Sequence, residues 1–68
     1  MNHLNKENKT VFYTEKFDRL LSECDCLIYL NIGDKFTDKE GKMYEITFKL
    51  FNSENEIIIY HGKLYAEF

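Results

Sequence analysis

Residues 33–68 read GDKFTDKEGKMYEITFKLFNSENEIIIYHGKLYAEF, and this stretch decides the fold. Apolar and polar residues alternate along much of it, as they do in strands that bury one face. Turn-forming residues interrupt the alternation three times: Asp-Lys-Glu-Gly at 38–41, Asn-Ser-Glu-Asn at 52–55 and His-Gly at 61–62. We therefore predict an antiparallel β-meander over 34–67, with strands near 34–38, 42–51, 56–60 and 63–67.

The turns also predict which side chains share a face, because side chains alternate along each strand. The first turn places Phe36 opposite Tyr44, and the loop after it places Leu50 opposite Ile57. The predicted core face is apolar and contains Phe36, Tyr44, Ile46, Phe48, Leu50, Ile57, Ile59, Leu64, Ala66 and Phe68. The opposite face is mixed and contains Thr47, Lys49, Phe51, Ile58, Tyr60, Lys63 and Tyr65.

Residues 14–24 carry the apolar spacing of an amphipathic helix. Phe17, Leu20, Leu21 and Cys24 fall at i, i+3, i+4 and i+7, and Thr14 is a suitable N-cap. A helix of this length needs a docking surface, and we expect it to pack on Phe48, Ile59 and Leu64. Residues 27–32 are expected to form a short strand or an extended connector.

These elements predict an α+β fold: one N-terminal helix packed on a strongly bent antiparallel sheet of three to four strands. We expect a single domain over residues 1–68, with residues 1–9 flexible. A chain of 68 residues has a thin core, which large aromatic side chains compensate. The net charge of −3 is spread evenly, so the sequence does not favour a phosphate-neutralising surface. With no apolar run of membrane-spanning length and no signal-peptide character, we expect a soluble, cytoplasmic protein.

Few residues suggest chemistry. Cys24 and Cys26 are too closely spaced for the usual zinc or dithiol motifs, so we interpret them as structural, with metal binding, redox chemistry or an intermolecular disulfide as alternatives. His61 is interpreted as a turn residue rather than a general base. The carboxylates of Asp34, Asp38 and Glu40 are assigned to turns, where they accept backbone hydrogen bonds. We therefore predict no catalytic residues, no metal, no cofactor and no enzymatic activity.

A surplus of apolar residues on the mixed face points instead to a binding role, since exposed apolar patches mark partner sites. The predicted partner-binding residues are Phe51, Ile58, Tyr60 and Tyr65. The partner is a host protein or a second copy of the chain, paired as a homodimer. The alternative is a single-stranded nucleic-acid binder that stacks bases on the same aromatic residues, although the acidic balance and the single arginine, Arg19, disfavour it.

Two segments resemble known small proteins. Residues 32–36 (IGDKF) and 41–46 (GKMYEI) resemble the GD-x-F and G-x-x-Y-x-I opening of strongly bent β-meanders, including SH3-like barrels. They are also similar to short proteins of phages and mobile elements from low-GC bacteria, and the Asn, Lys and Ile bias agrees with such a source. The resemblance implies a shape and an accessory role, such as inhibition of a host defence protein, and it implies no catalytic residue.

Overall fold

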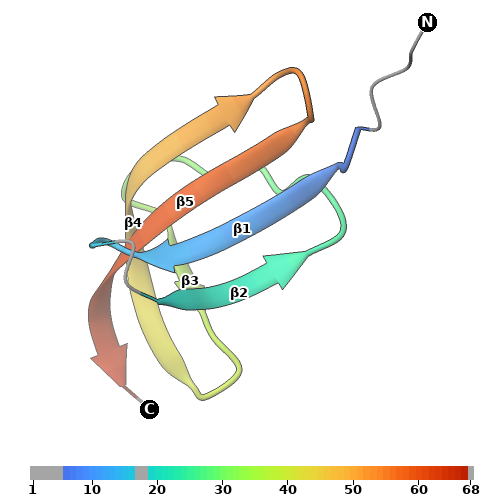
Figure 1. Cartoon of the computed structure of the whole chain (residues 1–68). Coiled ribbons are helices and arrows are strands. Elements are labelled where there is room, and N and C mark those ends of the chain that lie inside the picture. The colour runs from blue at the N-terminus through green and yellow to red at the C-terminus, as the bar shows by residue number, and fades with distance from the viewer. Residues whose placement is uncertain (1–5, 17–18, 68) are drawn as a thin grey trace, which may run out of the picture.

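The computed structural model describes residues 6–16 and 19–67, and in these residues every regular element is a β-strand. The strands are β1 (Lys9–Thr14), β2 (Leu20–Cys24), β3 (Lys35–Thr37), β4 (Lys42–Asn52) and β5 (Ile57–Glu67). They form one sheet in the order β2-β1-β5-β4-β3, curled into a half-barrel (Figure 1). The predicted α+β fold is therefore wrong, and the described chain is all-β.

The region predicted as a helix over 14–24 instead contains the turn and second strand of a hairpin. β1 and β2 pair antiparallel, and the Thr14 backbone N–H donates to the Arg19 carbonyl at 3.0 Å. The TVFYT run of β1 is rich in β-branched and aromatic residues, which favour strands. A bulge opposite Phe12 and Tyr13 allows Leu21 to reach the core, so the apolar spacing that resembles a helix also fits a bulged edge strand.

Part of the N-terminal prediction lies outside the described residues. This applies to residues 1–5 of the segment expected to be flexible, and to Phe17 and Phe68. Further along, the Glu7 and Lys9 backbone N–H groups donate to the carbonyls of Asn55 and Glu56, at 2.8 and 3.1 Å. These bonds continue the contact between the start of β1 and the loop before β5.

The first and last strands of the described chain pair in parallel, which the meander prediction did not include. Residues 9–14 of β1 align with residues 57–62 of β5, while β4 pairs antiparallel with the other side of β5. With neighbours on both sides, β5 continues without interruption through His61 and Gly62. The turn predicted there is wrong, and the two strands expected at 56–60 and 63–67 are one.

The turn between β3 and β4 agrees with the sequence prediction. Phe36 pairs with Tyr44, and the Asp38 carboxylate accepts hydrogen bonds from the Glu40 and Lys42 backbone N–H groups at 2.9 and 3.0 Å. Local turn chemistry is sufficient to specify this hairpin.

The hairpin between β4 and β5 has a different register and the opposite burial. Its loop covers residues 53–56, and Leu50 pairs with Ile59 rather than Ile57. Ile58 and Tyr60 are 0% exposed, whereas Phe48 is 41% and Leu50 is 49% exposed. The cause is a bulge between Ile46 and Phe48, which shifts the side-chain alternation of β4 by one residue. The core face predicted for this half of the sheet is therefore reversed.

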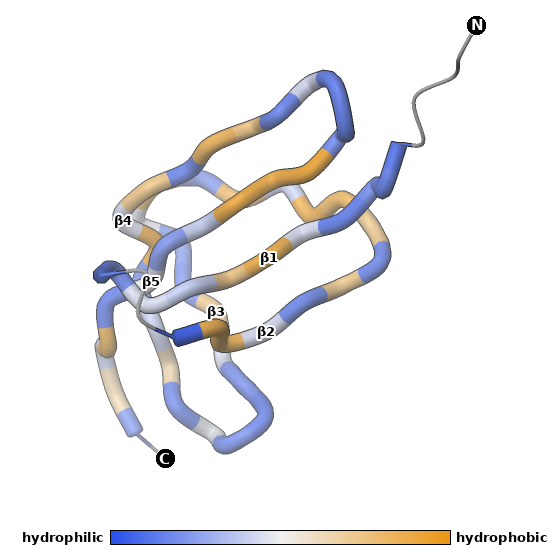
Figure 2. Tube along the Cα trace, in the orientation of Figure 1, coloured by the Kyte–Doolittle hydropathy of each residue, from blue (hydrophilic) through white to orange (hydrophobic). Residues whose placement is uncertain are grey.

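The buried face lines the inside of the curl. Its central cluster is Phe12, Leu21, Tyr44, Ile46, Ile58 and Tyr60. The segment joining β2 to β3, residues 25–34, crosses this face without forming a strand, and we call it the covering segment. Leu27 and Leu30 pack from it onto the core. Figure 2 shows the hydrophobic stretches of β1 and β5 side by side in the sheet.

Two buried side chains hold the covering segment to the sheet. The Tyr60 hydroxyl donates to the Ile28 carbonyl at 2.6 Å and accepts from the Leu30 backbone N–H at 2.7 Å. The Thr10 hydroxyl donates to the Cys26 carbonyl at 2.7 Å and accepts from the Ile28 backbone N–H at 2.8 Å. The two hydroxyl groups thus satisfy backbone groups of the covering segment that have no strand partner. Residues 6–16 and 19–67 contain no helix that could span a membrane.

Candidate partner-binding surface

The four residues predicted to bind a partner do not form one patch. Phe51 and Tyr65 are exposed, but Ile58 and Tyr60 are fully buried under the covering segment. The Tyr65 ring lies instead beneath the Lys35 ammonium group, 4.7 Å from the ring centroid. A partner could reach Ile58 or Tyr60 only after the covering segment had moved away.

The same burial removes the aromatic platform required by the nucleic-acid alternative. The Tyr60 ring stacks on Phe12 with 5.2 Å between centroids, and its hydroxyl is bonded to the covering segment. Tyr60 is therefore not available to stack on a base, and Phe51 and Tyr65 do not form a platform without it.

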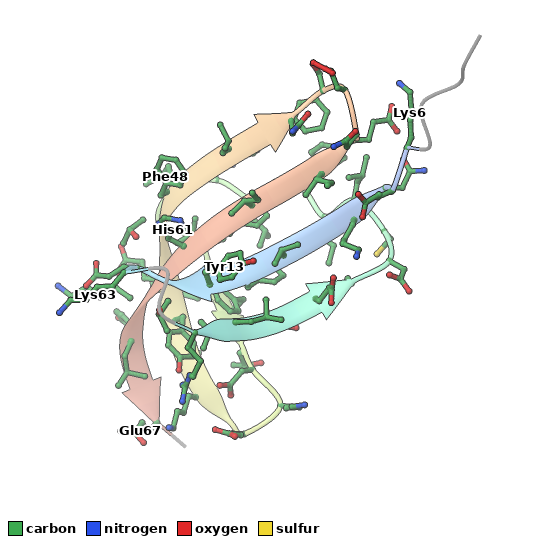
Figure 3. All side chains as sticks on the ribbon, in the orientation of Figure 1. Lys6, Tyr13, Phe48, His61, Lys63 and Glu67 are labelled. Carbon is green, nitrogen blue, oxygen red and sulfur yellow. The ribbon has the colours of Figure 1, made fainter. Side chains whose placement is uncertain are left out.

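The opposite side of the sheet carries a different apolar surface. Directly paired residues share a face, so one row runs from β4 to β2 through Phe48, His61, Tyr13 and Leu20. A second row runs through Leu50, Ile59 and Val11. We call this surface the outer face. Figure 3 shows Phe48, His61 and Tyr13 in line across β4, β5 and β1.

The outer face combines buried and exposed apolar groups. Val11 and His61 are buried by their neighbours, whereas Phe48, Leu50 and Leu20 are each between 41% and 49% exposed. The sequence prediction assigned Phe48, Leu50 and Ile59 to the core because unbroken alternation from Tyr44 and Ile46 places them on the same apolar face. It missed the outer face because nothing in the sequence signalled the bulge that turns these residues outward. A different signal was present in the VFY run at 11–13, which is typical of a strand with apolar groups on both faces and so could have indicated a second apolar surface.

Charges at the end of the outer face neutralise one another. The Lys9 ammonium lies 2.8 Å from the Glu23 carboxylate and 3.5 Å from that of Glu7. The hydrogen bond to Glu23 raises the pKa of Lys9 above its ordinary value. One ammonium group beside two carboxylates leaves this end of the outer face with only a small negative charge, which suits an apolar partner surface more than a strongly charged one.

His61 lies at the centre of this face. Its ring is tilted against the Phe48 ring with 4.6 Å between centroids, and burial lowers the pKa of His61 below its ordinary value of 6.5. Its place inside β5 corrects the interpretation of His61 as a turn residue.

The lowered His61 pKa predicts a pH-dependent stability. Because the folded chain holds His61 neutral, its contribution is complete above about pH 6.5 and is lost as the pH falls from there toward the lower folded pKa. We expect the melting temperature to fall between pH 7.5 and pH 5.5, and to fall less in His61→Gln. His3→Gln serves as the control, and an equal decline in wild type and His61→Gln would contradict the assignment.

The remaining candidate groups do not assemble into a reactive centre. In the part of the chain that the structure describes, no group of three or more His, Cys, Asp or Glu side chains could hold a metal ion. Cys24 is half-buried and Cys26 is exposed, both with free thiols. The Asp34 carboxylate accepts from the Asn31 backbone N–H at 2.7 Å, a turn role like that of Asp38.

Comparisons with known proteins assign no family to this chain. No protein-family model matches the chain, and neither a curated protein nor a solved structure does.

Proposed function

We propose that this chain is a cytoplasmic, non-enzymatic protein-interaction module that binds a host protein through its outer face. The observation that carries the proposal is the pair of rows on the outer face, one across four strands and one across three. In these rows Phe48, Leu50 and Leu20 are half-exposed, and the Phe48 ring packs against the buried His61. Apolar surface that is continuous and rigid is the usual mark of a protein contact.

Several features of the outer face support a protein partner. Phe48 rests on His61, so its ring loses little conformational freedom on binding. The ion pairs of Lys9 leave little net charge to attract a polyanion. The resemblance to phage and mobile-element proteins supports a host defence protein as the target, inhibited by occupation of its surface.

The test is capture of partners from a lysate of a low-GC bacterium with two matched variants. Leu50→Lys places a charge in the outer face, while Ile32→Lys places the same charge at a residue that is 60% exposed and outside it. We expect Leu50→Lys to lose the partner that wild type and Ile32→Lys retain, with all three proteins folded by circular dichroism. The same partners on Leu50→Lys would refute the proposal.

Light scattering separates a host partner from a second copy of the chain. A dimer through Ile58, Tyr60 and Tyr65 is not compatible with the burial of the first two, so self-pairing would have to use the outer face. The host-partner proposal expects a mass near 8.2 kDa at every concentration. A doubled mass that Leu50→Lys returns to 8.2 kDa would replace the host partner with a homodimer.

A further inference from the structure

A groove with a basic rim opens where β1 ends beside β5. It has a volume of about 290 Å³. Its lining residues Tyr44 and Leu64 are directly paired, and Tyr44 belongs to the core cluster, on the other side of the sheet from the two rows of the outer face. Its rim carries the side chains of Lys16, Arg19, Lys42 and Lys63, and its floor is formed by Tyr44 and Leu64. Tyr44 is buried and Leu64 is half-exposed, so the floor is apolar.

The groove is positive although the whole chain is negative. It gathers four of the nine basic residues, against a single lining carboxylate from Glu15. Within residues 6–16 and 19–67, Lys16, Arg19 and Lys63 have no ion-pair partner, and Lys42 lies 3.9 Å from Glu40. The Arg19 guanidinium donates to the Tyr44 hydroxyl at 3.4 Å, which holds it over the floor. An occupant of the groove must therefore bring negative charge.

The groove also borders an open strand edge. β1 pairs with β5 only as far as Gly62, while β5 continues to Glu67 with β4 on its other side. Figure 1 shows β5 running past the end of β1. Along residues 63–67, the β1 side of β5 has no neighbouring strand among the described residues. Such an edge presents backbone N–H and C=O groups that an extended peptide can pair with.

We propose that this groove binds an extended acidic peptide from a partner protein, which adds to the open edge of β5. The peptide backbone pairs with residues 63–67, its carboxylates meet the rim cations, and its apolar side chains rest on Leu64. A peptide fits better than a single-stranded nucleic acid, because the Tyr44 ring is buried and offers no face for base stacking. This site is separate from the outer face and goes beyond the proposed function.

The probe is a fluorescein-labelled decapeptide of alternating Glu and Val, followed by fluorescence anisotropy. We expect saturable binding, weakened about tenfold or more by Lys63→Glu, because reversal replaces attraction with repulsion. Lys6→Glu makes the same charge change at the far end of the molecule from Lys63 (Figure 3) and is expected to change affinity by less than about twofold. Leu50→Lys is also expected to bind normally, so that failure of the outer-face proposal and of this one can be told apart.

Two further probes test the mode of binding. The same decapeptide with N-methyl groups on alternate residues keeps its charge but cannot pair with a strand edge, and we expect it not to bind. A labelled oligothymidylate of equal length is expected to bind more weakly than the peptide. Equal weakening by Lys63→Glu and Lys6→Glu, unchanged binding of the N-methyl peptide, or preference for the oligonucleotide would each overturn the proposal.

Discussion

Replacement of Tyr60 by Ala is expected to lower the free energy of unfolding by about 3–5 kcal/mol, a large part of the stability of the chain. Tyr60 is a fully buried large side chain at the centre of the core, and its removal leaves a cavity that costs about 3–5 kcal/mol. A domain of this length is stable by only roughly 3–10 kcal/mol. Far-ultraviolet circular dichroism and urea titration measure the effect. Tyr29→Ala is the control, because Tyr29 is exposed and its loss is expected to change the free energy of unfolding by about 0.5 kcal/mol or less.

The milder variant Tyr60→Phe isolates the hydroxyl group. It keeps the ring but leaves the Ile28 carbonyl and the Leu30 N–H without their shared partner, at a cost of about 1–3 kcal/mol. Amide exchange at Leu30 should accelerate with this loss. A Tyr60→Phe variant that unfolds at the wild-type urea concentration would show that the hydroxyl does not hold the covering segment.

Replacement of Gly62 by Ala is expected to destabilise the chain by overpacking. A Cβ atom at Gly62 would lie 2.8 Å from the Phe36 ring and 2.9 Å from the Tyr44 Cβ atom. Added atoms in a packed core cost about 1–3 kcal/mol. In a domain of this size each kcal/mol lowers the melting temperature by about 4–8 °C, which thermal unfolding can resolve.

A second substitution tests whether the cost at Gly62 is steric. Phe36→Leu shortens the ring side chain, so the double variant with Gly62→Ala should recover part of the lost stability. Gly33→Ala is the matched control, since Gly33 has a φ of +95° and no atom within 4 Å of an added Cβ. Its cost comes from backbone strain, and we expect Phe36→Leu to add to it independently. An additive result at Gly62 as well would refute the steric explanation.

The parts of the fold that could be predicted from the sequence are those specified by local chemistry. Asp38 and its neighbours encode their turn directly, and the Phe36 to Tyr44 pairing follows from it. The helix predicted around Leu20 and Leu21 was wrong because an apolar spacing of three and four residues fits both a helix and a bulged strand. Pairing with β1 makes residues 20–24 a strand, a tertiary effect stronger than local propensity.

The candidate site was harder to predict, because it depends on one bulge and on one long-range pairing. The bulge after Ile46 determines whether Phe48 or Lys49 points inward. No residue type near the bulge predicts it from the sequence. The parallel pairing of β1 with β5 then helps to bury the face of β5 that carries Ile58, and it gives His61 neighbouring strands on both sides. Phe51 and Tyr65 are exposed as expected, but the surface between them could not be assigned without these two features.

The parallel contact between β1 and β5 has a consequence for biosynthesis. It joins Lys9 to Ile57, residues separated by most of the chain, so the sheet cannot be completed until the last strand has left the ribosome. Closing so long a loop is slow, and topologies dominated by distant pairings fold in milliseconds to seconds rather than microseconds. The nascent chain therefore has an interval in which the apolar residues of β1 are exposed without their partner strand.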